Sequence, residues 1–164
     1  MADVNYSPLL LNQGFYKYAR FVTIYICRGY ISSPIYIYNN MFDFLLLISA
    51  IVFITTDFIY LNSVQGFFGN QIKRVQGSPM VVNLLGAALC YIFLIAGINY
   101  FIIKPRKSVT DAFLLGIVIY GVYETTNYAL FKDWSALTVV IDTLWGGILF
   151  AFTTYVVNLL RGIV

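Results

Sequence analysis

The chain has 164 residues, of which 60% are hydrophobic and 10% charged, whereas soluble domains carry about 25% charged residues. The composition is therefore that of a membrane protein. The sequence contains no histidine, which excludes histidine-ligated metal sites, Ser-His-Asp or Cys-His catalysis, and a histidine pH switch. The net charge of +3 is spread thinly and forms no patch of the kind that binds nucleic acid.

Residues 1–41 are expected to form an N-terminal interfacial or docking segment. Three basic residues interrupt short apolar runs, and no uninterrupted apolar stretch of the length that a signal peptide needs follows the first charges. We interpret residues 14–30 as a short helix on the membrane surface. A loosely ordered tail is the alternative. The residues expected to contact headgroups or a partner are Lys17, Arg20 and Arg28.

Residues 42–164 are expected to form a bundle of membrane-spanning helices. A span needs about 20 predominantly apolar residues to cross a hydrocarbon core of about 30 Å. Four stretches meet this length, at about residues 42–61, 80–103, 112–131 and 134–160. The predicted fold is thus an all-α membrane protein, an antiparallel four-transmembrane-helix bundle with an N-terminal interfacial segment.

The links between these spans carry helix-boundary signals. Residues 62–77 are polar with spaced apolar residues and predict a helix lying on the membrane surface. Ser78-Pro79 is typical of an N-cap followed by proline at the first helical position. Ser108 with Asp111 predicts a capping box before the third span, and Asp133 is expected to cap the fourth.

The distribution of basic residues predicts the orientation. Seven basic residues lie on the side of the two termini and three on the other side, which places both termini in the cytoplasm. The seven are Lys17, Arg20, Arg28, Lys104, Arg106, Lys107 and Arg161, and the three are Lys73, Arg74 and Lys132.

The third span carries polar residues in its second half. An acid inside a span costs about 2.5–3.5 kcal/mol on insertion scales, so an intramembrane carboxylate indicates a functional site. Spacing of i, i+3, i+4 and i+7 places four of these residues on one helix face. They are Tyr120, Tyr123, Glu124 and Asn127.

All four spans are expected to bring a polar residue to a similar depth. At 1.5 Å per residue, the four residues lie roughly 6–12 Å below the non-cytoplasmic surface. They are Asp57, Asn83, Glu124 and Asp142. The spans contain no lysine or arginine to neutralise the acids, so we expect protons to be shared within the cluster.

The role of this cluster stays open at the level of the sequence. Buried polar groups can act as interhelical contacts worth about 0.6 kcal/mol each. The same groups could bind a ligand, a lipid headgroup or a proton, and cation binding or catalysis by a carboxylate pair are further alternatives. No nucleophile elbow, phosphate loop or metal motif is present in the sequence. We therefore predict no catalytic residue, no metal and no cofactor.

Three motifs resemble a known family. They are Asp57-x-x-Tyr60-Leu61, Tyr120-Gly121-x-Tyr123-Glu124-x-Thr126-Asn127 and Asp142-x-x-Trp145-Gly146. In this order and spacing they resemble small four-span predicted membrane proteins of unknown function, which occur in bacteria and some large DNA viruses. Family members often have Trp in place of Tyr60 and Asp in place of Glu124, and most bacterial members lack the segment 1–40. The resemblance implies the architecture and the polar residues but no reaction.

The functional hypothesis is a non-enzymatic integral membrane protein with a structural or assembly role. The added N-terminal segment and the composition suggest the internal membrane of a large DNA virus, with residues 1–40 contacting capsid proteins. The expected partners are therefore the lipid bilayer and a protein that binds residues 1–40. The competing hypothesis is a small carrier, or a ligand- or proton-binding protein, that uses the buried carboxylate cluster.

Overall fold

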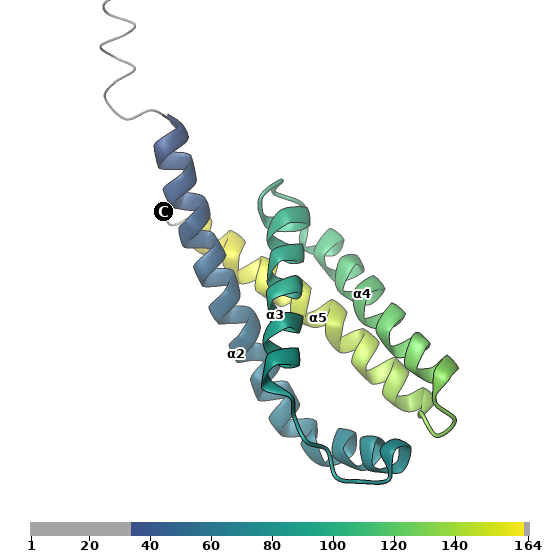
Figure 1. Ribbon diagram of the computed structural model, residues 1–164. Helices are drawn as coiled ribbons and strands as arrows, with labels where there is room; N and C mark the ends of the chain where they lie inside the picture. Colours follow the sequence, from purple (N-terminus) through teal and green to yellow (C-terminus); the bar gives the residue numbers. More distant parts are fainter. Residues whose placement is uncertain (1–33, 163–164) are drawn as a thin grey trace, which may run out of the picture. The chain divides into compact units, whose positions relative to one another are not determined.

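The computed structural model describes residues 34–162, with side chains from residue 44 onward. Every regular element in these residues is a helix (Figure 1), which confirms the predicted helical class for the described part of the chain. The chain divides into two units, Met1–Met41 and Phe42–Val164, and the following description concerns the second. The predicted contact residues Lys17, Arg20 and Arg28 lie outside the described residues.

Three of the described helices are long and apolar enough to cross a membrane: Phe44–Gln76, Leu84–Ile103 and Ala136–Arg161. The expected span 112–131 is also helical, because helix α4 runs Val109–Leu130. Helix α4 is long enough to cross a membrane, but its polar residues lower its mean hydropathy, and it is not one of the three apolar helices.

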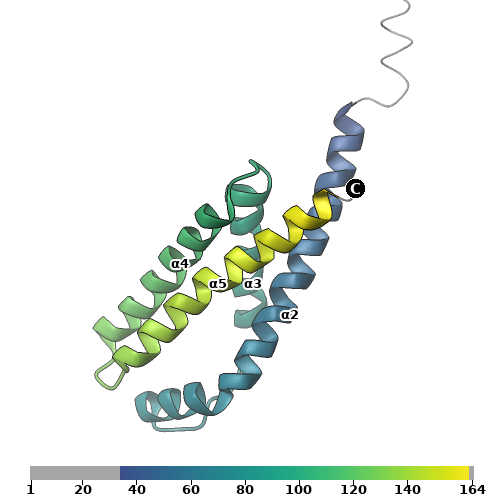
Figure 2. The same ribbon diagram turned by 180° about the vertical axis from the view of Figure 1, so that it is seen from behind.

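Helix α2 (Pro34–Gln76) is one continuous element of 43 residues, so the segment expected to lie on the membrane surface is the C-terminal part of α2 rather than a separate helix. At 1.5 Å per residue, its part Phe44–Gln76 (33 residues) is about 50 Å long, well over the thickness of a hydrocarbon core. Figures 1 and 2 show that the last part of α2 turns away from the direction of the earlier part. Asn62 and Ser63 donate 2.7 Å hydrogen bonds to the Phe58 and Ile59 carbonyls, a side-chain contact that bends helices.

Helix α3 (Leu84–Ile98) begins later than Ser78-Pro79 predicted. Asn83 is its N-cap, and the Asn83 side chain accepts a 3.1 Å hydrogen bond from the Gly86 amide. The helix continues as a π-helical turn, η1 (Asn99–Ile103). The wider turn leaves the consecutive residues Ile102 and Ile103 both buried.

Helices α4 and α5 (Ala136–Arg161) lie side by side in both views (Figures 1 and 2). A Cβ added to Gly116 would overlap the Gly146 carbonyl, and one added to Gly146 would overlap the Tyr120 ring. Small residues that let backbones approach closely are typical of membrane helix pairs. These glycines therefore set the distance between α4 and α5.

The boundaries of α4 and α5 confirm one predicted cap and correct another. Ser108 and Asp111 form the expected capping box at the start of α4. The N-cap of α5 is Ser135 rather than Asp133, because the Ser135 side chain accepts from the Leu137 amide. The Asp133 carbonyl instead accepts a 2.8 Å hydrogen bond from the buried side chain of Gln71 on α2.

An apolar core joins α2 to α5. Phe53 and Phe150 are both fully buried and meet edge to face, with ring centroids 5.2 Å apart. Nearer the 104–107 turn, the Asn99 side chain donates 2.8 Å hydrogen bonds to Ser49 on α2 and to the Ile95 carbonyl. The end of α3 is thereby fixed to α2 by a buried polar contact.

Candidate functional site

The carboxylate of Asp57 joins three helices. Asp57, on α2, is only 6% exposed. One oxygen accepts a 2.7 Å hydrogen bond from the Tyr91 hydroxyl on α3, and the other accepts a 2.8 Å hydrogen bond from the Trp145 indole on α5. A buried carboxylate is tolerated when its oxygens are hydrogen-bonded, and here both acceptors are used.

Tyr60 links this carboxylate to a second one. Its ring stacks on Trp145 with centroids 4.0 Å apart and an interplanar angle of 9°. Its hydroxyl donates a 3.4 Å hydrogen bond to Asp142. Because Trp145 also donates to Asp57, the two acids are connected through one aromatic pair.

Glu124 on α4 lies beside Asp142 on α5. Glu124 is 1% exposed and accepts a 2.8 Å hydrogen bond from the Trp134 indole. Its carboxyl group lies close enough to that of Asp142 for the two to interact. Two neighbouring carboxyl groups in a site of low dielectric can share a proton.

One buried side chain at the start of α5 has a polar atom without a hydrogen-bond partner among the described residues. Gly116 opposes Gly146 and Gly121 opposes Thr143, and the same antiparallel register sets Glu124 opposite the turn that contains Thr138. Thr138 is 0% exposed, and its hydroxyl has no partner among the described residues. Such unpaired buried groups are uncommon in native proteins.

We name the connected residues the carboxylate network; they are Asp57, Tyr60, Tyr91, Glu124, Trp134, Asp142 and Trp145. Sequence reasoning selected the three acids, and the sequence motifs also contain Tyr60 and Trp145. It missed Tyr91 and Trp134 as donors. The available signal was their N–H and O–H groups, which buried tyrosine and tryptophan side chains usually pair.

The remaining predicted residues divide into two groups. The Tyr120 ring packs against Gly146, and Tyr120 is close enough to the Asp57 and Asp142 carboxyl groups to interact with their charge. Asn127 follows Glu124 on the same face of α4, with a buried Nδ2 that lacks a partner among the described residues. Asn83 and Tyr123 are not in the network.

Those two exceptions have separate causes. Asn83 is exposed because α3 begins after it, and its side chain caps the helix. Tyr123 is 60% exposed. It precedes Glu124 by one residue, which turns it about 100° away from the buried carboxylate around the helix.

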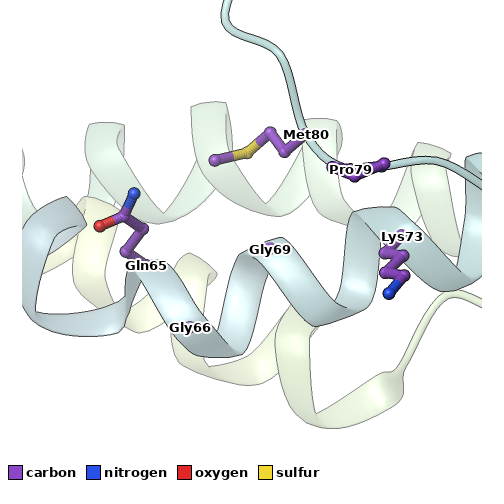
Figure 3. A pocket seen from close by; sticks show the side chains of 6 residues that line it. All are labelled: Gln65, Gly66, Gly69, Lys73, Pro79 and Met80. Atoms are coloured by element: carbon purple, nitrogen blue, oxygen red, sulfur yellow. The ribbon is translucent and has the colours of Figure 1, made fainter.

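Two open hollows occur near the C-terminal part of α2, and neither is lined by an acid of the network. One is lined by Phe67, Asn70, Lys73 and Arg74. The second, shown in Figure 3, is lined by Gln65, Gly66, Gly69, Lys73, Pro79 and Met80. Among the described residues, no group of three or more His, Cys, Asp or Glu side chains is arranged to hold a metal ion.

Comparison with known proteins identifies the chain at the family level. No curated protein and no solved structure matches it. A family model described as "Predicted membrane protein (DUF2177)" matches residues 42–159, which include every residue of the carboxylate network. The described helices and this match agree on a membrane protein, and the chain belongs to the DUF2177 family of predicted membrane proteins.

Proposed function

We propose that the protein is a non-enzymatic, multi-pass membrane protein with a structural or assembly role, in which the carboxylate network holds the helices together. One observation carries this proposal: Asp57 on α2 accepts hydrogen bonds from Tyr91 on α3 and Trp145 on α5. In a bilayer there is no water to satisfy a carboxylate if the helices separate. The network therefore favours the assembled helices.

The proposed architecture is an antiparallel bundle of four spans, in which α4 crosses the membrane in addition to the three apolar helices. Helix α4 has 22 residues, about 33 Å at 1.5 Å per residue, which matches a hydrocarbon core. It packs along the apolar helix α5 through Gly116 and Gly146, and its Glu124 is covered. We propose that both termini are cytoplasmic, and the basic residues of the 104–107 turn support this orientation.

A second candidate function is a small carrier, or a proton- or ligand-binding protein. It is supported by the neighbouring carboxyls of Glu124 and Asp142 and by the buried hydroxyl of Thr138, which has no partner among the described residues. Ionisable residues inside membranes commonly mark proton relays. The first proposal is preferred because the acids already have aromatic N–H and O–H donors.

The experiment that separates the two combines Glu124→Gln with Asp142→Asn. Amides retain hydrogen-bonding capacity, so the structural proposal expects a folded, assembled protein with a melting temperature close to that of the wild type. The matched control Asp57→Ala removes an acceptor from two helices and should lower the melting temperature strongly. Proton or solute flux in liposomes that the wild type supports and the double variant loses would overturn the structural proposal.

For the biological setting, we propose the internal membrane of a large DNA virus, with residues 1–40 contacting capsid proteins. The support is the sequence: a basic, tyrosine-rich segment precedes the part matched by the family model. Photo-crosslinkers placed at Lys17 and Arg28 in native membranes or particles test this proposal. Crosslinks to a coat protein are expected, and crosslinks to lipid alone would contradict it.

A further inference from the structure

We propose that the C-terminal part of α2, residues 62–76, binds the headgroup phosphate of an anionic phospholipid at the non-cytoplasmic surface. The observation behind this proposal is that one lysine, Lys73, lines two hollows. Their volumes are about 590 and 450 Å³. The carboxylate network takes no part in this site.

The geometry of α2 places this segment at the membrane surface. About 20 residues of α2 suffice to cross the hydrocarbon core, so a helix that continues to Gln76 must lie partly outside it. The turn of its last part, seen in Figures 1 and 2, is the change of direction expected where a span becomes an interfacial helix. Residues 62–76 are therefore at headgroup depth.

A buried contact holds the segment at that depth. The Gln71 side chain is 0% exposed and donates to the Asp133 carbonyl in the turn between α4 and α5. Arg74 donates a 2.8 Å hydrogen bond to the Gln71 side chain. The nearby Trp134 is of the residue type that collects at membrane interfaces. The segment is thus tied to the end of the bundle.

The segment is amphipathic and presents cations outward. Most of its buried and half-buried positions follow a helical spacing, at Val64, Phe67, Phe68, Gln71, Ile72 and Val75. Lys73 is exposed on the opposite side, and Arg74 is exposed at the edge of the buried face. The segment contains no acid, so its charge attracts anionic headgroups.

The second hollow has room for a headgroup because two glycines form its floor. Figure 3 shows Gly66 and Gly69 between Gln65 and Lys73, with Pro79 and Met80 on the chain segment that passes over the helix. A Cβ added at either glycine would have no neighbour within 4 Å. The Lys73 ammonium can bind phosphate oxygens, and Met80 offers an apolar contact to an acyl chain.

The test measures lipid-dependent stabilisation of the full-length protein in detergent. Short-chain phosphatidylglycerol, phosphatidylcholine of equal chain length and inorganic phosphate are titrated separately, and the shift in melting temperature gives an apparent affinity. For the wild type, the anionic lipid is expected to stabilise more than the zwitterionic one, and inorganic phosphate is expected to have little effect. Equal stabilisation by inorganic phosphate would overturn the assignment to lipid.

Three variants locate the site. Lys73→Ala should weaken the apparent affinity for phosphatidylglycerol about fivefold, the loss for one cation near an anionic surface. Gly69→Leu fills the hollow without changing charge and should weaken the affinity similarly. The matched control Lys107→Ala removes an exposed cation from the 104–107 turn and should leave the affinity unchanged. Should Lys107→Ala and Lys73→Ala weaken it equally, the site assignment is wrong.

A conservative pair covers the case in which Gly69→Leu fails to fold. Lys73→Arg keeps the cation and should retain the affinity, whereas Lys73→Gln removes it and should behave like Lys73→Ala. Retention of full affinity by Lys73→Gln would refute the proposal.

Discussion

The indole Nε1 of Trp145 donates a 2.8 Å hydrogen bond to the carboxylate of Asp57, 88 residues earlier in the chain. This bond joins α2 to α5 at a level where α3 also contributes a donor, Tyr91. The relationship predicts which substitutions damage the bundle.

Trp145→Phe should destabilise the protein by about 1–3 kcal/mol, because it leaves one buried oxygen of Asp57 without its donor. The stacked partner of Tyr60 would be altered at the same time. Thermal unfolding in detergent measures the effect. The control is Leu144→Ala, at a neighbouring position that is 49% exposed and should change the melting temperature little. Comparable losses in the two variants would count against the proposed bond.

Glu124→Gln and Glu124→Ala should differ in how much they lower the free energy of unfolding. Glutamine still offers an oxygen to the Trp134 indole and an amide to Asp142, so its cost should stay below about 1 kcal/mol. Alanine leaves the Trp134 N–H and the Asp142 carboxyl without this partner and should cost about 1–3 kcal/mol. Denaturant titration of both variants in the same detergent tests this, and equal stabilities would show that the hydrogen bonds of Glu124 do not stabilise the fold.

Gly146→Ala should be strongly destabilising, by more than about 2 kcal/mol, because the new Cβ overlaps the Tyr120 ring and α4 must move away from α5. The matched control is Gly97→Ala on α3, where an added Cβ meets nothing within 4 Å. That variant should be neutral or stabilising by up to about 1 kcal/mol, because alanine is the better helix former. The melting temperatures of the two variants in detergent test this prediction. An unchanged melting temperature for Gly146→Ala would mean that α4 and α5 are packed less tightly than the close contact at Gly146 indicates.

The capping box at the start of α4 predicts a pH dependence. The Ser108 hydroxyl and backbone N–H both donate to Asp111, and these bonds hold the pKa of the Asp111 carboxyl below its usual range. A carboxyl with a lowered folded pKa stabilises the fold fully above its unfolded pKa of about 3.9 and loses this contribution as the pH falls through the folded pKa.

The melting temperature of the wild type should therefore exceed that of Asp111→Asn by a constant amount above about pH 5. The difference should shrink as the pH falls below about 4. Parallel thermal scans across this range test the sign. A difference that grows on acidification would contradict the role of the ionised carboxylate.

The sequence was sufficient to find the helices and the three acids, because an acid in an apolar stretch is conspicuous and its depth follows from residue counting. The prediction that Asn83 lies within the second span and joins the buried cluster was wrong, because helix propensity does not distinguish a first-turn position from an N-cap. The helical spacing also joined Tyr123 to Glu124 on one face, although a face wide enough to hold both spans about 100° of the helix.

Other features could not be read from the sequence because they depend on tertiary contacts. The donors Tyr91 and Trp134 look like ordinary aromatic residues of a membrane helix or interface until the acids are placed beside them. Glycines occur in several of the helices, yet an added Cβ at Gly97 would meet nothing within 4 Å, whereas Gly116 and Gly146 form the close contact between α4 and α5. Which helices touch is decided by packing rather than by composition.

Helix α3 shows what its π-helical turn implies for its packing. Of Leu84–Ile98 only Ile98 is buried, while η1 buries Asn99, Ile102 and Ile103. Helix α3 is thus fixed at one end, with the Tyr91–Asp57 hydrogen bond as its polar tether farther along. Loss of the Tyr91–Asp57 hydrogen bond would therefore leave the part of α3 before Ile98 without this polar contact to α2, while the buried residues of η1 stay packed.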